Sequence, residues 1–252
     1  MIKRGSRIAL LLAALFFFFA SISSAFAESV TLKASDGTVV YGNVWRAAGL
    51  QSPMIVAFHQ AGSSSVEYAP IAPRLSQSGF TVLAIDQRSG GRAFGGSNRT
   101  VATRGRSASY EEALPDMEAA LAWAKENAQG APIIVWGSSY SAALVFVLAA
   151  KHPADVGGIV AFSPGEYLEG KHKVSAAAKE VRAPVFIDQA SDPEEIAQSA
   201  AILRAVASQN KRQFRSKAKS THGSSTLRAD TNAAGAELHW AEVIRFLDQF
   251  KQ

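Results

Sequence analysis

The chain has 252 residues, of which 48% are hydrophobic, and carries 26 lysines and arginines against 21 aspartates and glutamates. This length fits one large domain with a full buried core. The chain contains no cysteine, which excludes disulfide bonds, thiol catalysis and a lipoprotein anchor, so a metal site would have to use histidines and carboxylates.

The first 27 residues have the pattern of a cleaved secretory signal. Three basic residues precede an unbroken apolar run over residues 8–20, and Ala25-Phe26-Ala27 supplies an Ala-x-Ala cleavage site. The alternative is an uncleaved membrane anchor, but this run is short against the roughly 20 residues that span a bilayer. We expect cleavage before Glu28, a periplasmic or secreted protein, and no stable membrane insertion after cleavage.

Removal of the signal changes the charge balance of the chain. It takes away three basic residues, which leaves 26 − 3 = 23 lysines and arginines against 21 acidic residues, a net charge of +2. The basic pI therefore comes partly from the signal and does not favour a nucleic acid partner.

The chain after residue 28 opens with a β-hairpin pattern and then alternates between strands and helices. Two β-rich runs, 29–33 and 38–41, flank the turn-forming pair Asp36-Gly37. Further strands are predicted at 53–58, 80–85, 133–136, 158–162, 185–187 and 212–217, the last of these charged as an edge strand would be. Helices are predicted at 67–78, 141–151, 175–181 and 193–208. A further helix is predicted to follow a possible capping box formed by Ser109 and Glu112, and the last one carries the C-terminal apolar stripe that includes Trp240, Val243 and Leu247.

This alternation of short apolar strands with amphipathic helices requires a mostly parallel sheet covered on both faces. We expect a single α/β domain over residues 28–252, with about eight strands. Only about 20 residues separate the strand ending near Ser163 from the strand starting near Pro184, too few for a lid domain.

Residues 137–141, Gly-Ser-Ser-Tyr-Ser, stand between a strand and a helix, which is the layout of a nucleophile elbow. The positions two before and two after the nucleophile must be small, because strand and helix come close there. Around Ser139 they are Gly137 and Ser141, whereas around Ser138 they are tryptophan and tyrosine. Ser139 is therefore the candidate nucleophile. The alternative is a Gly-Ser turn that merely opens a helix.

A general base is expected on the loop after the last strand, where His222 lies in Thr221-His222-Gly223-Ser224. The four other histidines end or begin predicted elements or lie in a short polar loop: His59, His152, His172 and His239. The alternative for His222 is a solvated loop histidine. If His222 is the base, activity falls as it becomes protonated, below roughly pH 6 to 7.

The acid that orients this histidine is expected after the strand at 185–187. Asp188 continues that strand, whereas Asp192 lies in the loop beyond it, so Asp192 is the candidate. Asp192 also precedes Pro193 and two glutamates, which is typical of a helix N-cap. Glu166, after the preceding strand, is the reserve acid.

An oxyanion hole needs two hydrogen-bond donors. One is the backbone N–H of Tyr140, directly after the nucleophile, and the other is expected from the loop His59-Gln60-Ala61-Gly62, where we favour the Ala61 N–H. His59 and Gln60 are candidate substrate contacts in that loop. A simple turn into the next helix is the alternative.

The segment 88–107 is irregular and rich in glycine, serine and arginine. A long loop in a compact domain is usually functional or mobile. Its arginines can clamp a substrate carboxylate, with Arg88 as the candidate, or can simply be solvated. They are Arg88, Arg92, Arg99, Arg104 and Arg106.

Together these motifs resemble the α/β-hydrolase superfamily over essentially the whole chain after the signal. Residues 59–62 stand where many members have His-Gly, and residues 86–90, Asp-Gln-Arg-Ser-Gly, are similar to their Asp-x-Arg-Gly segment. Ser139, Asp192 and His222 follow the triad order nucleophile, acid, base. The resemblance is to small members without a cap, similar to dienelactone hydrolases and esterases, and it implies an α/β-hydrolase fold.

Two residues depart from that family pattern: Gln60 replaces the usual first glycine of the oxyanion loop, and Ser141 replaces the last glycine of the elbow. The resemblance implies hydrolysis of a small carboxylic ester or lactone through an acyl-enzyme on Ser139, without metal or cofactor. Ser139-Tyr140 also resembles the elbow of prolyl-oligopeptidase-type enzymes, so a small peptidase or amidase is an alternative. A non-catalytic binding protein of the same fold is another.

Overall fold

A computed structural model of the protein describes residues 27–49 and 51–251. Apart from Ala27, the predicted signal lies outside the described residues. The predicted hairpin lies at the start of the described residues: β1 (Glu28–Lys33) and β2 (Val39–Trp45) pair antiparallel, with Lys33 opposite Val39. Gly37 in the turn has φ +85°, a conformation that glycine adopts without strain.

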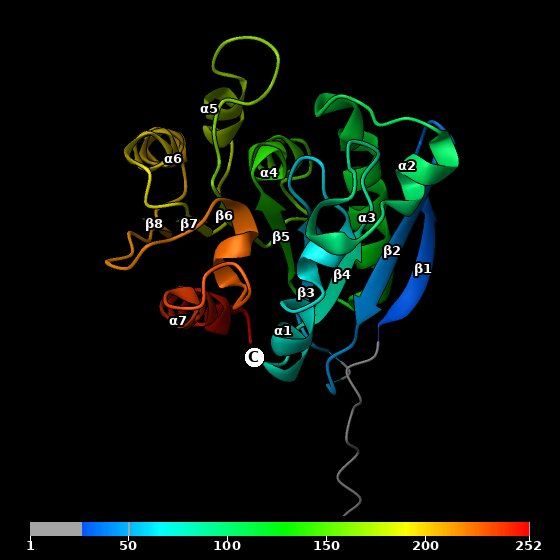
Figure 1. Ribbon diagram of the computed structural model, residues 1–252, viewed down its shortest axis with the longest axis horizontal. Coiled ribbons are helices and arrows are strands. Elements are labelled where there is room, and N and C mark those ends of the chain that lie inside the picture. The colour runs from blue at the N-terminus through cyan, green and yellow to red at the C-terminus, as the bar shows by residue number, and fades with distance from the viewer. Residues whose placement is uncertain (1–26, 50, 252) are drawn as a thin grey trace, which may run out of the picture.

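One sheet of eight strands is found in the described chain, as the sequence predicts (Figure 1). Its spatial order is β1-β2-β4-β3-β5-β6-β7-β8, and every pair from β4 to β8 is parallel. The remaining strands are β3 (Met54–Phe58), β4 (Thr81–Ile85), β5 (Ile133–Ser138), β6 (Gly158–Phe162), β7 (Val185–Asp188) and β8 (Lys211–Gln213). The central strands β3 to β7 are buried along their whole length, which explains why they are apolar runs without alternation.

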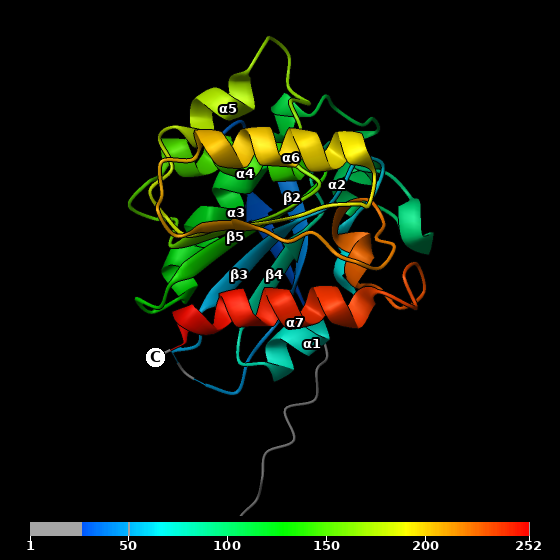
Figure 2. The same cartoon turned by 90° about the vertical axis from the view of Figure 1, so that its left-hand side faces the viewer.

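Helices cover both faces of the sheet, so the fold has three layers (Figures 1 and 2). One face carries α3 (Leu114–Asn127), α4 (Tyr140–Lys151), α5 (Lys173–Ala178) and α6 (Pro193–Ala205). The other face carries α1 (Ala72–Gln77) and α7 (Ala236–Leu247). Each face has its own apolar core: Met117 of α3 and Phe146 of α4 belong to the first, and Leu75 of α1 and Trp240 of α7 to the second.

Two helical segments differ from the sequence-based expectation. The helix predicted at 67–78 is divided into a 3-10 turn, η1 (Ser65–Tyr68), and the short α1, because Pro70 between them has no N–H to continue a helical hydrogen-bond series. The segment 88–107, expected to be irregular, contains a 3-10 turn η2 (Ala93–Gly95) and a short helix α2 (Arg99–Arg104). Asn98 caps α2 by accepting a hydrogen bond from Val101 N–H at 2.8 Å.

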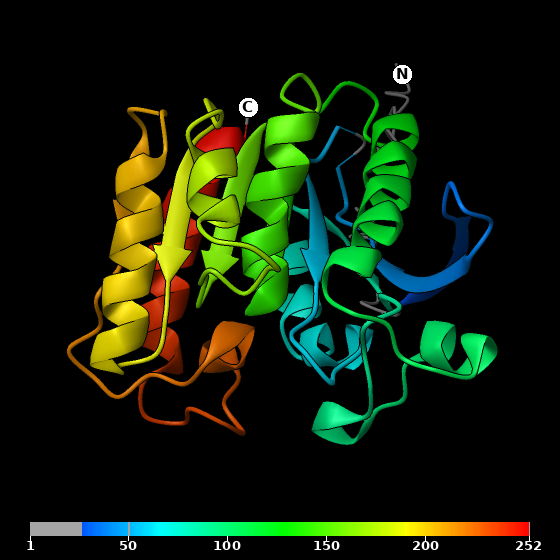
Figure 3. The same cartoon turned by 90° about the horizontal axis from the view of Figure 1, so that it is seen from above.

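The connection between β6 and β7 contains α5 alone, so no large additional domain interrupts the fold there. Within residues 27–49 and 51–251, every helix is too short or too polar to cross a membrane. The carboxyl ends of the parallel strands all lie at one edge of the sheet, and the segment of η4 (Gly223–Leu227, orange) lies beyond their arrowheads (Figure 3). This edge is where Ser139 and His222 follow their strands.

Candidate active site

Ser139 has the strained backbone of a nucleophile elbow. It directly follows β5 and has φ 59° and ψ −122°, outside the usual regions for a residue with a side chain. Its N–H donates to Phe162 O at 2.8 Å, which fixes the turn to the end of β6. A Cβ on Gly137 would lie 2.3 Å from Ser141 O, so the close approach of strand and helix requires a glycine there.

The structure brings Ser139 and His222 into direct contact. Ser139 Oγ lies 2.7 Å from His222 Nε2, and the other ring nitrogen, Nδ1, lies 2.7 Å from Glu195 Oε1. An ionised carboxylate only accepts hydrogen bonds, so the proton of the neutral ring is on Nδ1 and Nε2 accepts from the serine hydroxyl. The Ser139 residue is 8% exposed and the His222 side chain 42% exposed, so the pair is reachable from solvent.

Glu195, and not Asp192, is the carboxylate on His222, which corrects the sequence-based prediction. Asp192 is the N-cap of α6, and its Oδ1 accepts hydrogen bonds from Glu194 N–H at 2.9 Å and Glu195 N–H at 3.1 Å. The N-cap interpretation of Asp192 was therefore the right one. The same N-cap pattern could have indicated Glu195 as the acid. A helix that is capped by Asp192 has Glu195 in its first turn, at the edge of the sheet where His222 lies.

The environment of Glu195 keeps it ionised. Burial by itself would raise the pKa of this carboxyl, but hydrogen bonds with His222 and Ser163 outweigh burial and hold the pKa below its usual range. Its second oxygen, Oε2, accepts from Ala190 N–H at 3.1 Å. Both oxygens are thus held in place, which restricts the carboxylate to one orientation toward the imidazole.

The two other acids considered from the sequence are used elsewhere in the fold. Asp188 is fully buried and pairs with Nδ1 of His239 on α7 at 2.6 Å. Glu166 accepts from the N–H groups of Val174 and Ser175, each at 2.9 Å, at the start of α5. Neither carboxylate has a hydrogen bond to His222 in the described structure.

The oxyanion loop is held from inside by His59. Burial lowers the pKa of His59, so its ring is neutral. Its Nδ1 lies 2.8 Å from Gln60 O, and its Nε2 accepts from Gln87 N–H at 3.0 Å. In a trans peptide the N–H points opposite to the C=O, so the bond to Gln60 O turns the Ala61 N–H away from the buried ring.

This arrangement corrects the role predicted for His59, whose side chain is fully buried and is not available to a substrate. Gln60 is only partly buried as a residue, but its Oε1 is buried and has no hydrogen-bond partner among the described residues. Neither Ala61 N–H nor Tyr140 N–H has a protein acceptor within residues 27–49 and 51–251. Both backbone donors are therefore available for an anionic oxygen.

Arg88 is not available as a substrate clamp, which corrects another prediction. Its guanidinium donates to Asp116 Oδ1 at 2.6 Å from Nη2 and at 3.0 Å from Nε, and it also pairs with Asp36. The side chain is only 5% exposed. Arg99 is also used internally, because its Nε donates to Asp86 Oδ2 at 2.9 Å. These arginines stabilise the segment 88–107 against the sheet.

The histidine loop is anchored directly after His222 by two backbone N–H groups that donate to side-chain hydroxyls. Gly223 N–H donates to Ser163 Oγ at 2.9 Å, and Ser224 N–H donates to Ser138 Oγ at 2.9 Å. Ser224 Oγ in turn accepts from Trp136 Nε1 at 2.9 Å. The loop that carries His222 is thus fixed to the ends of β5 and β6.

A substitution of Gly223 with alanine is expected to disrupt this loop. The residue has φ +68°, and an added Cβ would lie 2.4 Å from Ser138 Oγ and 2.7 Å from Gln60 Oε1. We expect a destabilisation of about 1 to 3 kcal/mol and a loss of more than about 100-fold in any reaction that depends on the Ser139–His222 pair, because small displacements at a site are costly. Thermal unfolding and initial rates measure the two effects.

Gly37→Ala is the matched control. Gly37 also has a positive φ, +85°, but a Cβ there meets nothing within 4 Å. This variant has the same type of backbone strain, without the clash and far from Ser139. Equal losses of activity in the two variants would contradict the proposed anchoring of the histidine loop.

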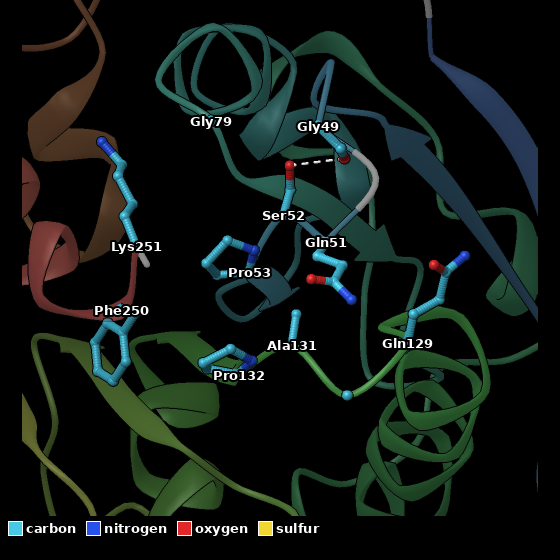
Figure 4. A pocket seen from close by; sticks show the side chains of 11 residues that line it. Gly49, Gln51, Ser52, Pro53, Gly79, Gln129, Ala131, Pro132, Phe250 and Lys251 are labelled. Carbon is cyan, nitrogen blue, oxygen red and sulfur yellow. Dashed lines mark hydrogen bonds between the residues drawn. The ribbon is translucent and has the colours of Figure 1, made fainter.

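A cavity of about 540 Å³ lies away from this site, at the opposite edge of the sheet (Figure 4). It is lined by Pro53 and Pro132, which directly precede β3 and β5, whereas Ser139 follows the other end of β5. Its Lys251 pairs with Asp248 at 2.7 Å. The cavity is therefore not part of the constellation around Ser139.

Comparison with solved structures shows the same fold in several hydrolases. An esterase from Pyrococcus furiosus is 18% identical with a TM-score of 0.67, covering 89% of this chain and 93% of that one. A dienelactone hydrolase from Anabaena variabilis is 16% identical with a TM-score of 0.69, covering 90% and 99%. A cold-adapted esterase from an Arctic intertidal metagenomic library is 18% identical with a TM-score of 0.66, covering 90% and 94%.

A search among curated proteins finds none that matches this chain. The family model described as "Serine aminopeptidase, S33" matches residues 51–234, which is more than half of the chain and includes Ser139, Glu195 and His222. The protein therefore belongs to the serine aminopeptidase S33 family of α/β hydrolases.

Proposed function

We propose that this protein is a serine hydrolase that cleaves a carboxylic ester or lactone of a small substrate through an acyl-enzyme on Ser139. The observation that carries the proposal is the continuous chain of hydrogen bonds from Ser139 Oγ through His222 to Glu195, with both distances at 2.7 Å. This chain is the arrangement that activates a serine hydroxyl as a nucleophile.

The first half of the proposed reaction forms the acyl-enzyme. Ser139 Oγ attacks the ester carbonyl carbon while its proton passes to His222 Nε2, and Glu195 stabilises the resulting imidazolium. The negative oxygen of the tetrahedral intermediate accepts hydrogen bonds from the Tyr140 and Ala61 N–H groups. When the intermediate collapses, the carbon–oxygen bond to the alcohol breaks and the alcohol takes the proton from His222.

The second half releases the acid. Water attacks the acyl carbon, its proton passes to His222 Nε2, and the bond to Ser139 Oγ then breaks as the serine takes that proton back. The water consumed and the acid and alcohol released balance the reaction. No metal or cofactor is required by these steps.

The test is a panel of short-chain p-nitrophenyl esters, lactones and aminoacyl p-nitroanilides, combined with labelling by a fluorophosphonate. We expect turnover of the esters and covalent labelling at Ser139, identified by peptide mass spectrometry. A protein that neither turns over any ester nor reacts with the fluorophosphonate would contradict the proposal and revive the non-catalytic alternative.

A second candidate function is a small peptidase or amidase, and the description of the matching family as a serine aminopeptidase favours it. The same Ser139 and His222 can cleave an amide, because His222 can protonate the leaving amine. Faster turnover of aminoacyl p-nitroanilides than of esters, measured as kcat/KM, would favour this alternative.

We also propose that the protein is exported and that residues 1–27 are removed, on the basis of the basic start, the apolar run and the Ala-x-Ala site. N-terminal sequencing of the protein from a periplasmic or culture fraction should begin at Glu28. A protein that retains Met1 would contradict it.

A further inference from the structure

Glu67 is a completely buried acid beside the candidate active site that the proposed reaction does not use. It lies in η1, and its residue has no solvent exposure. Its Oε2 accepts from Gln60 N–H at 2.8 Å, and its Oε1 accepts from Ser138 Oγ at 2.6 Å. A buried carboxylate is costly unless it is well hydrogen-bonded, so its position calls for an explanation.

The carboxylate of Glu67 connects the three loops that form the site. Gln60 precedes Ala61 in the oxyanion loop, and Ser138 precedes Ser139 in the elbow. Ser138 Oγ also accepts from Ser224 N–H at 2.9 Å, two residues after His222. One side chain thus fixes the backbone next to the oxyanion donor and next to the nucleophile, and reaches the histidine loop through Ser138.

The hydrogen bonds fit the ionised form of Glu67. Gln60 N–H is a donor, and Ser138 Oγ, which already accepts from Ser224 N–H, uses its own proton toward Glu67. Burial nevertheless raises the pKa of Glu67 to about 7, against the opposing effect of the hydrogen bonds from Ser138 and Gln60. This acid therefore titrates in the pH range in which a histidine base also titrates.

Four charged or titratable groups from the neighbouring elements act on Glu67. The positive charges of Arg228 and His222 favour its ionised form. Tyr68 in η1 and Tyr140 in α4 are buried phenols whose own ionisation Glu67 opposes. Arg228 does not pair with the Glu67 carboxylate; its Nη1 donates to Glu67 backbone O at 2.9 Å, and its guanidinium pairs with Asp230.

We propose that Glu67 is a positioning residue whose ionised carboxylate holds the oxyanion loop, the nucleophile elbow and the histidine loop in the relative positions that catalysis requires. The inference rests on the proposed hydrolase function. Glu67 touches no reacting atom; it acts through Gln60 and Ser138. Acidification then lowers activity in part by protonating Glu67.

The test is Glu67→Gln, which keeps the size of the side chain and removes its charge. We expect kcat for a p-nitrophenyl ester to fall about 10- to 100-fold with little change in KM, because the alignment of catalytic groups is lost while substrate binding is kept. We also expect the acid limb of the kcat/KM profile to become shallower and to move to lower pH, because the acid at position 67 no longer titrates.

Thermal unfolding provides a second readout, which reports the ionisation of Glu67 in the folded protein. The folded-state pKa of Glu67, about 7, is raised above the ordinary value of 4.5, so wild-type stability is highest with Glu67 protonated and decreases as pH rises from about 4.5 through 7. Glu67→Gln lacks this decrease. The Tm of the variant minus that of the wild type should therefore be more positive at pH 8 than at pH 5.

Two further variants complete the experiment. Glu126→Gln, an exposed position on α3, removes one charge far from Ser139 and serves as the matched control. Ser138→Ala removes the hydrogen bond between Ser138 Oγ and Glu67 by changing the donor. It should also lower kcat with little change in KM, so the test does not depend on the folding of one variant.

The outcomes separate this inference from the proposed function. A Glu67→Gln variant with wild-type kcat and an unchanged acid limb would overturn the role of Glu67 while leaving the hydrolase proposal intact. The same conclusion follows if kcat falls together with a loss of Tm that is equal at pH 5 and pH 8, which is the signature of simple destabilisation. A wild type without esterase activity or Ser139 labelling would overturn the proposed function, and this inference with it.

Discussion

Replacement of Ser139 with alanine is expected to reduce kcat for p-nitrophenyl ester hydrolysis by about 10⁴- to 10⁶-fold and to abolish labelling by a fluorophosphonate. The hydroxyl is the only group that can form the acyl-enzyme in the proposed reaction, so nothing replaces it. The residual rate would come from the oxyanion donors and from substrate binding. Stopped-flow and long-time initial-rate assays together cover this range.

The fold should survive this change. The backbone strain at Ser139, with φ 59°, is present in the wild type and is unchanged by a substitution with alanine, and the hydroxyl is the only group that this substitution removes. We expect Tm to change by no more than a few degrees, because the change neither fills nor empties the core. Wild-type turnover in a folded Ser139→Ala protein would contradict the assignment of the nucleophile.

The second large effect is expected from Glu195→Gln. A glutamine keeps the shape of the side chain but removes the charge that stabilises the imidazolium of His222. It can also present an N–H to Nδ1 and so favour the wrong tautomer of the ring. Changes of this kind typically reduce kcat by about 10⁴-fold. Activity should be lost with little change in the circular dichroism spectrum or in Tm.

Asp192→Asn is the matched control for Glu195→Gln, because the two acids lie in the same helical turn. Asparagine caps helices about as well as aspartate, so the bonds that Asp192 makes to Glu194 and Glu195 N–H are kept. We expect the activity of Asp192→Asn to remain within a few-fold of the wild type, and likewise that of Glu166→Gln. A larger loss in Asp192→Asn than in Glu195→Gln would reinstate Asp192 as the acid on His222.

The architecture was largely predictable because it depends on short-range patterns. Fully apolar runs such as 53–58 indicate buried parallel strands, and Asp36-Gly37 indicates a hairpin turn; both are confirmed. The helix predicted at 67–78 is instead divided in two, because Pro70 has no N–H and interrupts the hydrogen-bond series.

The roles of buried polar residues were not predictable in the same way. The sequence leaves Arg88 as either a candidate substrate clamp or a solvated side chain, but Arg88 pairs with Asp116, which lies 28 residues away in the sequence. His59 was interpreted as a substrate contact, but both of its ring nitrogens are used inside the fold. Composition and spacing do not indicate which of several arginines or histidines becomes buried, because burial depends on how distant segments pack.

The sequence by itself determined the parallel sheet, its covering helices and the choice of Ser139 over Ser138, because periodicity and steric limits at the elbow act between residues that are close in the chain. Only the tertiary structure decided that Glu195 meets His222, 27 residues away, and that Glu67 bridges three loops. A hydrogen bond between distant segments requires both side chains to reach the same point in space. That condition is set by helix capping and by the packing of loops at the sheet edge, and it is not encoded in the spacing of acids along the chain.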